Sequence, residues 1–458
     1  MRIVVCVRQG LDGEINPFDA CAYEAALRIS GAEVILLSMA PASAKDFLLS
    51  LTRLGARRAI LLSDKVFAGA DTLATAYALS LAIRRLSPDL VFCGRQTLIG
   101  DTAQTGAMLA EMIGYSLITN VLRLEIAGDT VTCETREDGV QSASLPALLT
   151  VERVGTLRFP GIFSRVGEVE TLTATNLGAD TAKCGLSGSP TRVLATAENT
   201  SGKRKCKWIA PSDLAEIVNQ TRQNQGKTIV AARSERLLDG VYAVGDEVYE
   251  MASLVSDTVK VIAKTDADTI AEIIKKEQPK AVLWASDAWS KRTAATVAAR
   301  LSLGLCADCT ALESDGERLV MYRPALSGSI IAKIVSNTAP AMATVRTKSD
   351  ADDVVVAIGY GAKDSIEGAK AFASRLGASL AASRKVVDND LLPYPLQVGL
   401  TGKTVAPPVY VALGISGAVH HVAGMQNAGT VIAVNPDKDA PIFEYADYGI
   451  VAKVEDIL

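Results

Sequence analysis

The sequence predicts an α/β protein built on parallel sheets, and three observations support this fold class. Hydrophobic residues make up 49% of the 458 residues but aromatic residues only 5%, which is typical of Val- and Ala-rich strands buried on both faces. Short apolar runs alternate with helical stretches. One strand-and-helix pattern occurs twice. At this length we expect two to four domains, each with its own core.

The first region shows the alternation of strands and helices most clearly. We expect strands at 2–7, 33–38, 59–63 and 90–93, and helices at 18–29, 43–54, from 71 onward and at 102–113. Alternating residues at 121–151, with a turn at Asp138-Gly139, predict a hairpin. Ligands of parallel sheets bind beyond the carboxyl ends of the strands. We therefore expect a ligand at residues 94–105, which include the loop 94–101.

The duplication is the most informative pattern within the chain. Residues 70–74, followed by the strand 90–93, recur as residues 267–271, followed by the strand 281–284. After the strand, the first copy has the polar loop 94–101 flanked by glycines, which favours a ligand. The second copy has Ala285 to Lys291 there and is expected to be a packing partner. Residues 171–207 have the composition of a linker, and the cluster Lys203-Arg204-Lys205 is expected to be solvated.

Charge and composition exclude several classes of protein. A net charge of −4 and a pI near 5.5 argue against nucleic-acid binding. The chain begins directly with a strand and has no long apolar span, so we expect a soluble, cytoplasmic protein without an export signal. Eight cysteines are scattered singly except for Cys306 and Cys309. A single pair favours reduced structural thiols over a metal site, and we expect no metal.

The segment 383–449 is the strongest candidate for a ligand site. It contains both histidines and the turn Gly414-Ile415-Ser416-Gly417, which follows the apolar run 409–413. Glycines let the backbone approach a ligand, and a helix N-terminus attracts phosphate. The pattern therefore predicts a nucleotide-type cofactor, although glycine turns of purely structural origin are common after strands.

Five motifs in this segment resemble, in the same order, the FAD domain of the electron-transfer flavoprotein alpha subunit. They are SRKVVD at 383–388, QVGLTGK at 397–403, GISGAVHHVAG at 414–424, VIAVNPD at 431–437 and PIFEYADYGIV at 441–451. The N-terminal half resembles the beta subunit of that family at 15–19, 39–41, 54–59, 68–79, 94–106 and 145–150. The chain is thus similar to a fusion of both subunits, with the beta part first.

The resemblance implies a fold and its boundaries. It implies two adenine-nucleotide-hydrolase-like, doubly wound parallel-sheet domains and a C-terminal Rossmann-like FAD-binding domain, with the two halves forming an intramolecular pseudo-heterodimer. We expect a beta-like domain at 1–170, a linker at 171–207, an alpha-like domain at 208–345 and the FAD domain at 346–458. The hinge of the FAD domain is expected at 346–351.

The resemblance also implies an FAD site. His421 would donate toward flavin N1 and O2, Arg384 would lie over the ring and Thr401 would bond near N5. In each case a structural role is the alternative: a surface charge for Arg384, a helix cap for Thr401 and a core histidine for His421. Leu400 and His420 depart from the usual motif. The cofactor-binding residues implied are Ser383, Arg384, Asp388, Gln397, Val398, Gly399, Thr401, Gly402, Gly414, Ile415, Ser416, Gly417, His421, Asn435 and Asp447.

In the beta-like half the family binds a second adenine nucleotide, either AMP or, in electron-bifurcating members, a second FAD. A helix cap would explain Asp71 equally well. The short stretch between Gln9 and Ile15 argues against the bifurcating type. The residues implied are Cys6, Asn16, Met39, Asp71, Thr72, Thr75, Gly94, Asp101, Gln104 and Thr105.

The expected function is that of an electron carrier with no catalytic residues for a substrate. It would accept electrons from a dehydrogenase and pass them singly, through FAD, to a quinone-linked or other acceptor. Two alternatives remain: a two-FAD, NADH-dependent bifurcating flavoprotein and a nucleotide-binding regulatory protein. The loop 161–168 is shorter and more acidic than the family's recognition loop for acyl-CoA dehydrogenases, so we expect a different dehydrogenase partner.

Overall fold

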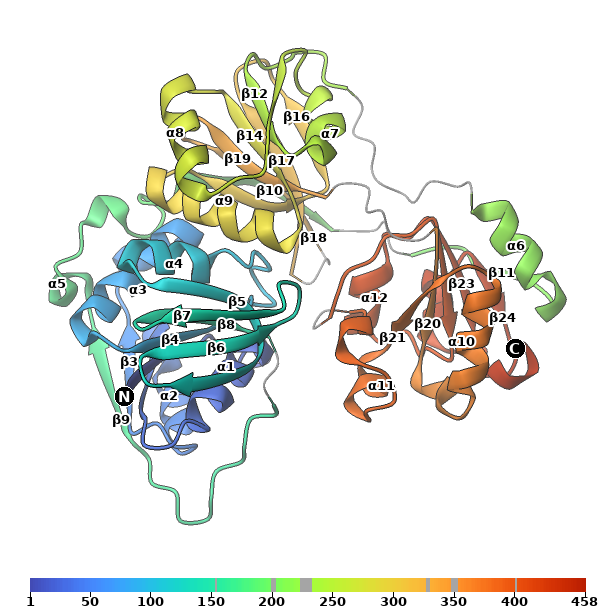
Figure 1. Ribbon diagram of the computed structural model, residues 1–458, viewed down its shortest axis with the longest axis horizontal. Coiled ribbons are helices and arrows are strands. Elements are labelled where there is room, and N and C mark those ends of the chain that lie inside the picture. The colour runs from blue at the N-terminus through green and yellow to red at the C-terminus, as the bar shows by residue number, and fades with distance from the viewer. Residues whose placement is uncertain (153–154, 199–202, 223–232, 327–329, 347–352, 400–401) are drawn as a thin grey trace. The chain divides into compact units, whose positions relative to one another are not determined.

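The computed structural model describes residues 1–458 except 153–154, 199–202, 223–232, 327–329, 347–352 and 400–401 (Figure 1). The chain forms two compact units, and each is described by itself. One unit comprises Met1–Thr196, Ala231–Leu326 and Ala332–Thr347, and the other comprises Ala197–Val230, Ser327–Ile331 and Lys348–Leu458. Both copies of the duplication belong to the first unit. Apart from Arg346, the predicted hinge lies outside the described residues.

The first copy is built on a nine-stranded sheet of order β7-β6-β5-β8-β4-β1-β2-β3-β9. From β8 to β9 all neighbouring strands are parallel, whereas β5, β6 and β7 form an antiparallel extension that includes the predicted hairpin. The strands are β1 (Arg2–Cys6), β2 (Glu33–Met39), β3 (Arg58–Leu62), β4 (Leu90–Gly94), β5 (Ser116–Ala127), β6 (Thr130–Thr135), β7 (Val140–Ser144), β8 (Ala147–Val151) and β9 (Glu168–Leu172).

The order of the central strands creates a switch point between β1 and β4. From β1 the chain continues to β2 on one side of the sheet order, and it later returns to place β4 on the other side. Alternate residues of β1 enter two cores, because side chains of a strand alternate between faces. Ile3 and Val5 pack with α1 (Pro17–Leu27) and α2 (Lys45–Thr52), while Val4 packs with α3 (Thr72–Leu86) and α4 (Thr105–Ile113). A crevice for a ligand is expected at such a point.

The second copy has a five-stranded parallel sheet of order β13-β12-β14-β19-β15. A separate four-stranded sheet has the order β10-β18-β17-β16. The elements are β10 (Thr191–Glu198), β12 (Val241–Val244), α7 (Tyr249–Ser253), β13 (Val259–Ile262), α8 (Ala267–Glu277), β14 (Ala281–Ala285), α9 (Ala288–Leu301), β15 (Leu305–Cys309), β16 (Ala311–Ser314), β17 (Leu319–Ala325), β18 (Ile330–Ser336) and β19 (Ala341–Val345).

The two copies share one apolar core. Helices α3 and α4 of the first copy pack against α8 and α9 of the second (Figure 1). Arg300 forms an ion pair of 2.7 Å with Glu111, and Arg292 forms one of 2.6 Å with Asp138. The predicted duplication therefore packs as a pseudo-symmetric pair, in which equivalent helices face each other.

The segment predicted to be a linker, 171–207, carries more structure than its composition indicates. It contains the end of β9, α5 (Ala174–Leu177), strand β10 and the first residue of β11 (Lys207–Trp208). Most of β10 is exposed, so this edge strand shows no apolar alternation. The prediction of a solvated basic cluster is wrong for Arg204, whose side chain is 3% exposed and donates to the carbonyls of Ala428 (2.6 Å) and Gly429 (3.0 Å). These partners are distant in sequence, which hides them from local pattern analysis.

The second unit is organised around a six-stranded parallel sheet of order β11-β24-β23-β22-β20-β21. Its central strands are completely buried, as expected for strands covered on both faces. Helices α6, α10 and α11 cover one face and α12 the other. The elements are α6 (Leu214–Thr221), β20 (Val354–Ile358), α10 (Ile366–Arg375), β21 (Ser379–Ala382), α11 (Arg384–Asp388), β22 (Val409–Leu413), α12 (Val419–Met425), β23 (Thr430–Val434) and β24 (Tyr448–Ile450).

Candidate nucleotide sites

The glycine turn after β22 lies at the carboxyl edge of the six-stranded sheet. Gly414 has φ +63, and a Cβ atom there would lie 2.6 Å from the backbone nitrogen of Ala362. Only glycine therefore allows the segments that follow β20 and β22 to pass this closely. Ser416 is exposed beyond the turn, whereas Ile415 and Gly417 are buried. The turn presents backbone and one hydroxyl group at the edge where ligands of parallel sheets bind.

A second predicted motif, 397–403, packs against α12 at the same edge. Gln397 is 1% exposed, and its carbonyl accepts a hydrogen bond of 2.8 Å from the Lys403 backbone. A Cβ atom on Gly399 would lie 2.7 Å from the carbonyl of His420, so the turn contacts the helix backbone directly. Val398 is buried and Gly402 closes the turn. Leu400 and Thr401 lie outside the described residues.

His421 projects from α12 into the space beneath this turn. Its side chain is buried, with 6% exposure, and its Nε2 atom lies 2.9 Å from the hydroxyl of Tyr410 in β22. Among the described residues, Nδ1 has no hydrogen-bond partner. Burial lowers the pKa of His421 to about 4, and the Val398 backbone offsets part of this effect. The imidazole is therefore neutral at pH 7, while the neighbouring His420 is exposed.

Arg384 and Asp388 lie on α11, which begins directly after β21 and Ser383. The Nε atom of Arg384 lies 3.1 Å from Asp388 Oδ2, and both side chains are largely exposed. This pairing fits the alternative of a surface charge, and a contact of Arg384 with FAD stays a prediction. Pattern analysis missed Lys385, whose ammonium lies 4.2 Å from the centre of the Tyr360 ring. Tyr360 comes shortly after the apolar strand β20, and this position was the signal by which sequence analysis could have found the contact.

Asn435 connects the end of β23 to the glycine turn. Its Nδ2 atom donates to the carbonyl of Ile415 at 3.0 Å, and its Oδ1 atom accepts from the Asp437 backbone at 2.9 Å. Together, Ser383, Gln397, Gly414, Ser416, His421 and Asn435 come from segments that follow β21, β22 and β23. The structure thus gathers most of the predicted cofactor residues along one edge.

Asp447 is not part of this group. It precedes β24 instead of following it, and it lies level with Val431 at the start of β23. Its Oδ2 atom accepts from the Val431 backbone at 2.9 Å and pairs with Arg204. Because all these strands are parallel, Asp447 lies at the opposite edge of the sheet. Its carboxylate stabilises the attachment of the 204–208 segment to the sheet.

In the first copy, the loop 95–104 lies over the switch point between β1 and β4. Asn16 is 3% exposed and holds this loop by donating from Nδ2 to the Gln96 carbonyl (3.0 Å) and accepting at Oδ1 from the Leu98 backbone (3.2 Å). Arg95 donates at 2.8 Å to Glu152, a carboxylate that is 1% exposed. Asn16 and Glu152, which are both distant from the loop in sequence, thereby fix the position of the loop.

Gly94 ends β4 where α1 begins to cross it. A Cβ atom on Gly94 would lie 2.7 Å from the Phe18 carbonyl carbon and would also collide with the Asp19 carboxylate. Burial raises the pKa of Asp19 to about 7, although hydrogen bonds from Asn16 and the Arg8 backbone act in the opposite direction. Asp19 is a buried titratable group that sequence reasoning missed, even though it lies in the segment 15–19 that carries the resemblance.

Asp71 caps α3, as its alternative interpretation stated. Its Oδ1 atom accepts from the backbones of Leu73 (3.0 Å) and Ala74 (3.1 Å), and its Oδ2 atom accepts from the hydroxyl of Thr191 (2.7 Å). In the described conformation, Asp71 therefore has a structural role as a helix cap. Thr72, the first residue of α3, donates to Gln104 Oε1 at 3.1 Å.

Three buried nitrogen atoms near this loop have no hydrogen-bond partner among the described residues. They are Gln104 Nε2, Arg95 Nε and Arg323 Nε. Arg323, from β17 of the second copy, is 6% exposed and donates to the Asp101 carbonyl at 2.9 Å. Burial, and next the charge of Asp308, raise the pKa of Asp101. Buried unpaired donors are costly, so these atoms favour an acceptor such as an ordered water or a ligand.

The remaining predicted residues lie around the same edge. Cys6 and Met39 end β1 and β2, and Thr105 begins α4. Thr75 lies one turn into α3 and is half-buried. Of the predicted second-nucleotide residues, Cys6 and Gly94 end the two strands of the switch point, and contacts of these residues with a nucleotide stay predictions.

The second copy closes the equivalent edge with its own side chains. Only Ser286 and Asp287 separate β14 from α9. Lys264 pairs with Glu247 at 2.6 Å and with Asp287 at 3.0 Å, and its ammonium lies 5.5 Å from the centre of the Trp289 ring. The expectation that this copy is a packing partner agrees with this arrangement.

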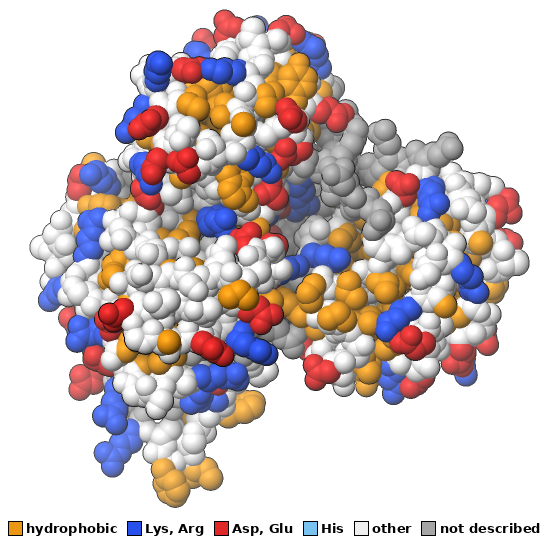
Figure 2. Space-filling view, viewed as in Figure 1, with side chains coloured by type: hydrophobic (Ala, Val, Ile, Leu, Met, Phe, Trp, Pro, Cys, Tyr) orange, Lys and Arg blue, Asp and Glu red, His pale blue; other side chains and the backbone are white. Residues whose placement is uncertain are grey.

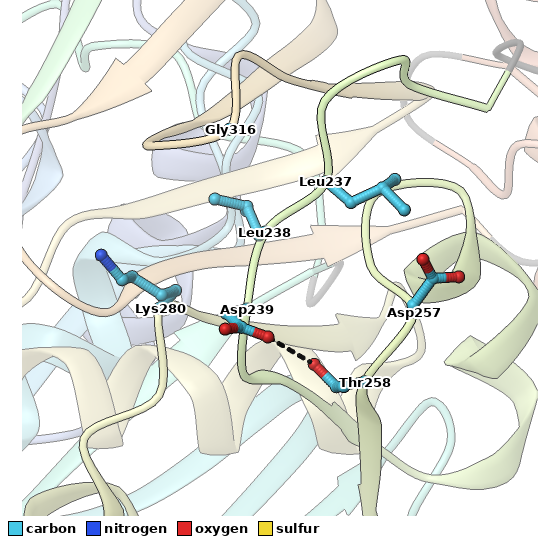
Figure 3. Close-up of a pocket in the computed structure, with 7 residues that line it drawn as sticks. All are labelled: Leu237, Leu238, Asp239, Asp257, Thr258, Lys280 and Gly316. Carbon is cyan, nitrogen blue, oxygen red and sulfur yellow. Dashed lines mark hydrogen bonds between the residues drawn. The ribbon is translucent and has the colours of Figure 1, made fainter.

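A cleft of about 370 Å³ in the second copy lies away from these edges (Figure 3). Asp239, Thr258 and Lys280 precede β12, β13 and β14, so the cleft is at the amino ends of the strands. Figure 3 shows Thr258 hydrogen-bonded to Asp239, at 3.3 Å. It lacks the glycine turns of the nucleotide edges. Its lining residues are Leu237, Leu238, Asp239, Asp257, Thr258, Lys280 and Gly316.

Cys306 and Cys309 lie within β15 and not in a turn between a helix and a strand, as their neighbours had suggested. A β-bulge separates them, with Asp308 at φ +58, and both thiols are buried in the same core. Among the described residues, no group of three metal-ligating side chains occurs, and no helix combines the length and apolarity needed to cross a bilayer.

Comparisons with known proteins place the chain in one family. Residues 3–177 and 223–381 match the model "Electron transfer flavoprotein domain", and residues 349–426 match "Electron transfer flavoprotein FAD-binding domain". The electron transfer flavoprotein subunit beta of Thermoanaerobacterium thermosaccharolyticum is 43% identical over 203 residues, which are 42% of this chain and 78% of the relative. The subunit alpha of the same organism is 33% identical over 293 residues, 52% of this chain and 88% of the relative.

A further relative is the protein FixA of Azorhizobium caulinodans. It is 37% identical over 254 residues, which are 50% of this chain and 90% of FixA. Matches to both a beta and an alpha subunit show that the chain combines two subunits in one polypeptide, as the order of its motifs predicted.

Proposed function

Because the chain belongs to the electron transfer flavoprotein family, we propose that it accepts electrons from a dehydrogenase and passes them singly, through FAD, to a quinone-linked or other redox acceptor. The FAD would bind at the carboxyl edge of β20 to β23. The observation that carries the proposal is His421, a buried neutral imidazole beside two glycine-containing turns, whose Nδ1 atom has no hydrogen-bond partner in the described part of the chain.

The residues at this edge fit FAD. The turn 414–417 brings backbone close to the edge, as pyrophosphate binding requires, and Ser416 adds an exposed hydroxyl group. Bound FAD supplies the ability to carry one or two electrons. A hydrogen-bond donor at His421 would stabilise the negative charge of the reduced ring at N1 and O2, because a fixed donor in a buried site interacts strongly with charge. Ser383, Gln397 and Asn435 would orient the remaining parts.

Arg384 would add positive charge in this proposal. Its guanidinium is exposed, and among the residues that the structure describes it pairs with Asp388 across one turn of α11, so little free energy holds it there. It can therefore turn toward a bound ring without unfolding other structure. The balance of one fixed neutral donor and one mobile cation would set the flavin potential.

The first copy is proposed to hold a second adenine nucleotide. The support is a group of buried donors around the loop 95–104 that have no partner among the residues that the structure describes, namely Gln104 Nε2, Arg95 Nε and Arg323 Nε. These donors suit the phosphate of AMP or the diphosphate of a second FAD. A two-FAD, NADH-dependent bifurcating flavoprotein is the second candidate function, favoured by Arg323, because a buried cation from the other copy would suit a flavin as well as a phosphate.

A dehydrogenase other than an acyl-CoA dehydrogenase is the proposed donor. The loop after Arg158 exposes Phe159 (91%), Ile162 (92%) and Phe163 (95%), and Figure 2 shows hydrophobic side chains at the tip of this protruding loop. Exposed apolar groups of this size mark a contact with another protein. Glu168 makes the end of the loop acidic. Transfer from an acyl-CoA dehydrogenase at the rate of its own carrier would contradict this choice.

The function is tested by purifying the full chain with FAD supplied and titrating it anaerobically with a reductant. The expected result is one FAD that is reduced and then reoxidised by a one-electron dye, with AMP released on denaturation. Two FADs, one of them reduced rapidly by NADH, would favour the bifurcating candidate. A colourless protein that retains only an adenine nucleotide would contradict electron transfer and support a regulatory role.

A further inference from the structure

Tyr410 and His421 form an isolated polar pair inside the FAD-binding unit. Tyr410 lies in the middle of the fully buried strand β22 and is 0% exposed, and His421 is 6% exposed. The tyrosine hydroxyl lies 2.9 Å from Nε2 of the imidazole. Their ring centres are 6.3 Å apart with a tilt of 54°, so they meet through the polar atoms and not by stacking.

Counting hydrogen atoms assigns the direction of this hydrogen bond. Burial raises the pKa of the Tyr410 hydroxyl well above 10, so it keeps its proton, and the neutral imidazole has one N–H. If that N–H were on Nε2, the tyrosine proton would lack an acceptor among the described residues. If Tyr410 donates to Nε2, the tyrosine proton has an acceptor and the imidazole proton is on Nδ1, where the Val398 backbone or a bound ligand can accept it. Leaving a buried donor unpaired costs about 1–3 kcal/mol, enough to decide the tautomer.

The surroundings of the ring favour the same assignment. The backbone of Val398 raises the pKa of His421, which is the effect of a carbonyl that faces a ring N–H. The next residue, Gly399, packs on the helix so closely that a Cβ atom there would lie 3.3 Å from the Cα atom of His421. Val398, Gly399 and α12 therefore enclose the imidazole, and the Val398 backbone lies near the ring without forming a well-aligned hydrogen bond to Nδ1.

We propose that Tyr410 is a positioning residue, which holds His421 with its proton on Nδ1 and presents this N–H as the donor to N1 and O2 of bound FAD. The inference rests on the proposed function for the flavin position, whereas the role of Tyr410 follows from the pair itself. Without the tyrosine hydroxyl, the two tautomers would become similar in free energy, and the donor would be present only part of the time.

The chain offers a direct test because it has only two histidines, His420 and His421. The full chain, loaded with FAD and labelled with ¹⁵N-histidine, gives two imidazoles in a nitrogen-detected or long-range ¹H–¹⁵N NMR spectrum. A His420→Gln variant assigns the signals. The proposal expects Nδ1–H and an unprotonated Nε2 for His421 in the wild type, and a mixture or a shift toward Nε2–H in Tyr410→Phe.

The second readout is the ratio of affinities for reduced and oxidised FAD, measured from the flavin potential and the binding of the oxidised form. Because the Nδ1–H tautomer would then be populated only about half of the time, this ratio should fall about twofold in Tyr410→Phe. Tyr448→Phe, in β24 of the same sheet, is the control and should change neither readout. A merely structural role for Tyr410 would lower the affinity for both forms of FAD and leave the ratio unchanged.

Several outcomes would overturn the proposal. An Nε2–H tautomer in the wild type would reverse the hydrogen bond, and an unchanged tautomer in Tyr410→Phe would remove the positioning role. A changed tautomer with an unchanged affinity ratio would show that Nδ1 does not face the flavin. If the wild type bound no FAD, the proposed function would fail, and the tautomers of the flavin-free chain would still decide whether Tyr410 positions His421.

Discussion

The two copies of the duplicated domain share a pattern of alternating parallel strands and helices, but they differ at the carboxyl edges of their sheets. In the first copy, ten residues, 95–104, connect β4 to α4, and they surround buried donors that have no partner among the described residues. In the second copy, two residues, 286–287, connect β14 to α9, and Lys264 pairs with both Glu247 and Asp287 across the edge. The first edge has buried donors that could serve a ligand, whereas described side chains at the second edge pair with each other.

This difference shows that the connections after the strands, and not the core helices, distinguish the two copies. The helices α3, α4, α8 and α9 are needed in both copies, because they form the shared core between them. The connections after the strands do not contribute to that core and can therefore diverge. The three carboxylates described as buried, Asp19, Glu24 and Glu152, all belong to the first copy, and Asp19 and Glu152 contact the residues that end β4 and begin the loop after it.

The largest expected effect concerns Asp19 and pH. Its pKa is raised in the folded protein to about 7 from about 4, so between these values the folded state binds the proton that the unfolded state has released. The free energy of unfolding should therefore fall as pH rises from 4 to 7, by at most about 4 kcal/mol for this group, and be constant above 7. Urea unfolding at several pH values measures this slope.

Asp19→Asn is the matching variant, and it should lack this part of the slope. Glu24→Gln is the control, because the Glu24 pKa is lowered by its pairing with Arg158 and Arg28, against the effect of burial. If Asp19→Asn and the wild type had parallel pH profiles, Asp19 would be ionised throughout and the first edge would hold a buried negative charge.

The second-largest difference between the copies is expected when the residues that end β4 and β14 are exchanged. Gly94→Ala places a methyl group against Phe18 and Asp19, which should destabilise the protein by about 3 kcal/mol and remove the second nucleotide. The reverse change, Ala285→Gly, should cost about 1 kcal/mol and leave the nucleotides unchanged. Thermal unfolding and nucleotide release measure both. Full nucleotide content in Gly94→Ala would contradict the role assigned to this edge.

Removing one unpartnered donor should weaken the ligand without changing the fold. Gln104→Ala should reduce affinity for the second nucleotide about tenfold, because it deletes one hydrogen bond to a charged group. Calorimetric titration of the nucleotide-free chain with AMP measures this change, and Gln141→Ala in β7 is the control. Equal affinities in the two variants would indicate that Gln104 serves only Thr72.

The smallest effect is expected at the closed edge. Lys264→Ala breaks two ion pairs whose side chains are each about 40% exposed, so it should cost less than about 1 kcal/mol. It should also create no new nucleotide site, because the loop that would surround a ligand is absent in this copy. A gain of bound nucleotide would show that the ion pairs, and not the length of the connection, close the edge.

The sequence alone predicted the fold class and most of the strands, because buried parallel strands leave continuous apolar runs such as 354–358 and 409–413. Gly414 and Asn435 lie at the carboxyl edge, because each follows such a run directly, and their predicted contact with FAD stays a prediction. It misplaced Asp447, whose motif spans the start of β24, so proximity in sequence did not indicate the same edge. It predicted a linker at 171–207 because edge strands exposed to solvent need no apolar pattern.

Other features depend on contacts between distant segments and were beyond sequence reasoning. The pairing of Tyr410 with His421 links a strand to the following helix and is not a recognisable motif. Arg323 reaches the Asp101 carbonyl from another copy of the domain. Burial raises the pKa of Asp19, which packs against Gly94 at the end of β4. In each case the chemistry depends on what surrounds the side chain, which a local pattern does not contain.

The most direct test of the contrast between open and closed edges is the nucleotide content of the purified full chain, quantified by the visible spectrum and by chromatography after denaturation. We expect two nucleotides per chain: one FAD that is retained in Gly94→Ala and one adenine nucleotide that this variant loses. Absence of flavin from protein supplied with FAD, or a third nucleotide that is lost in a variant of the second copy, would contradict the account.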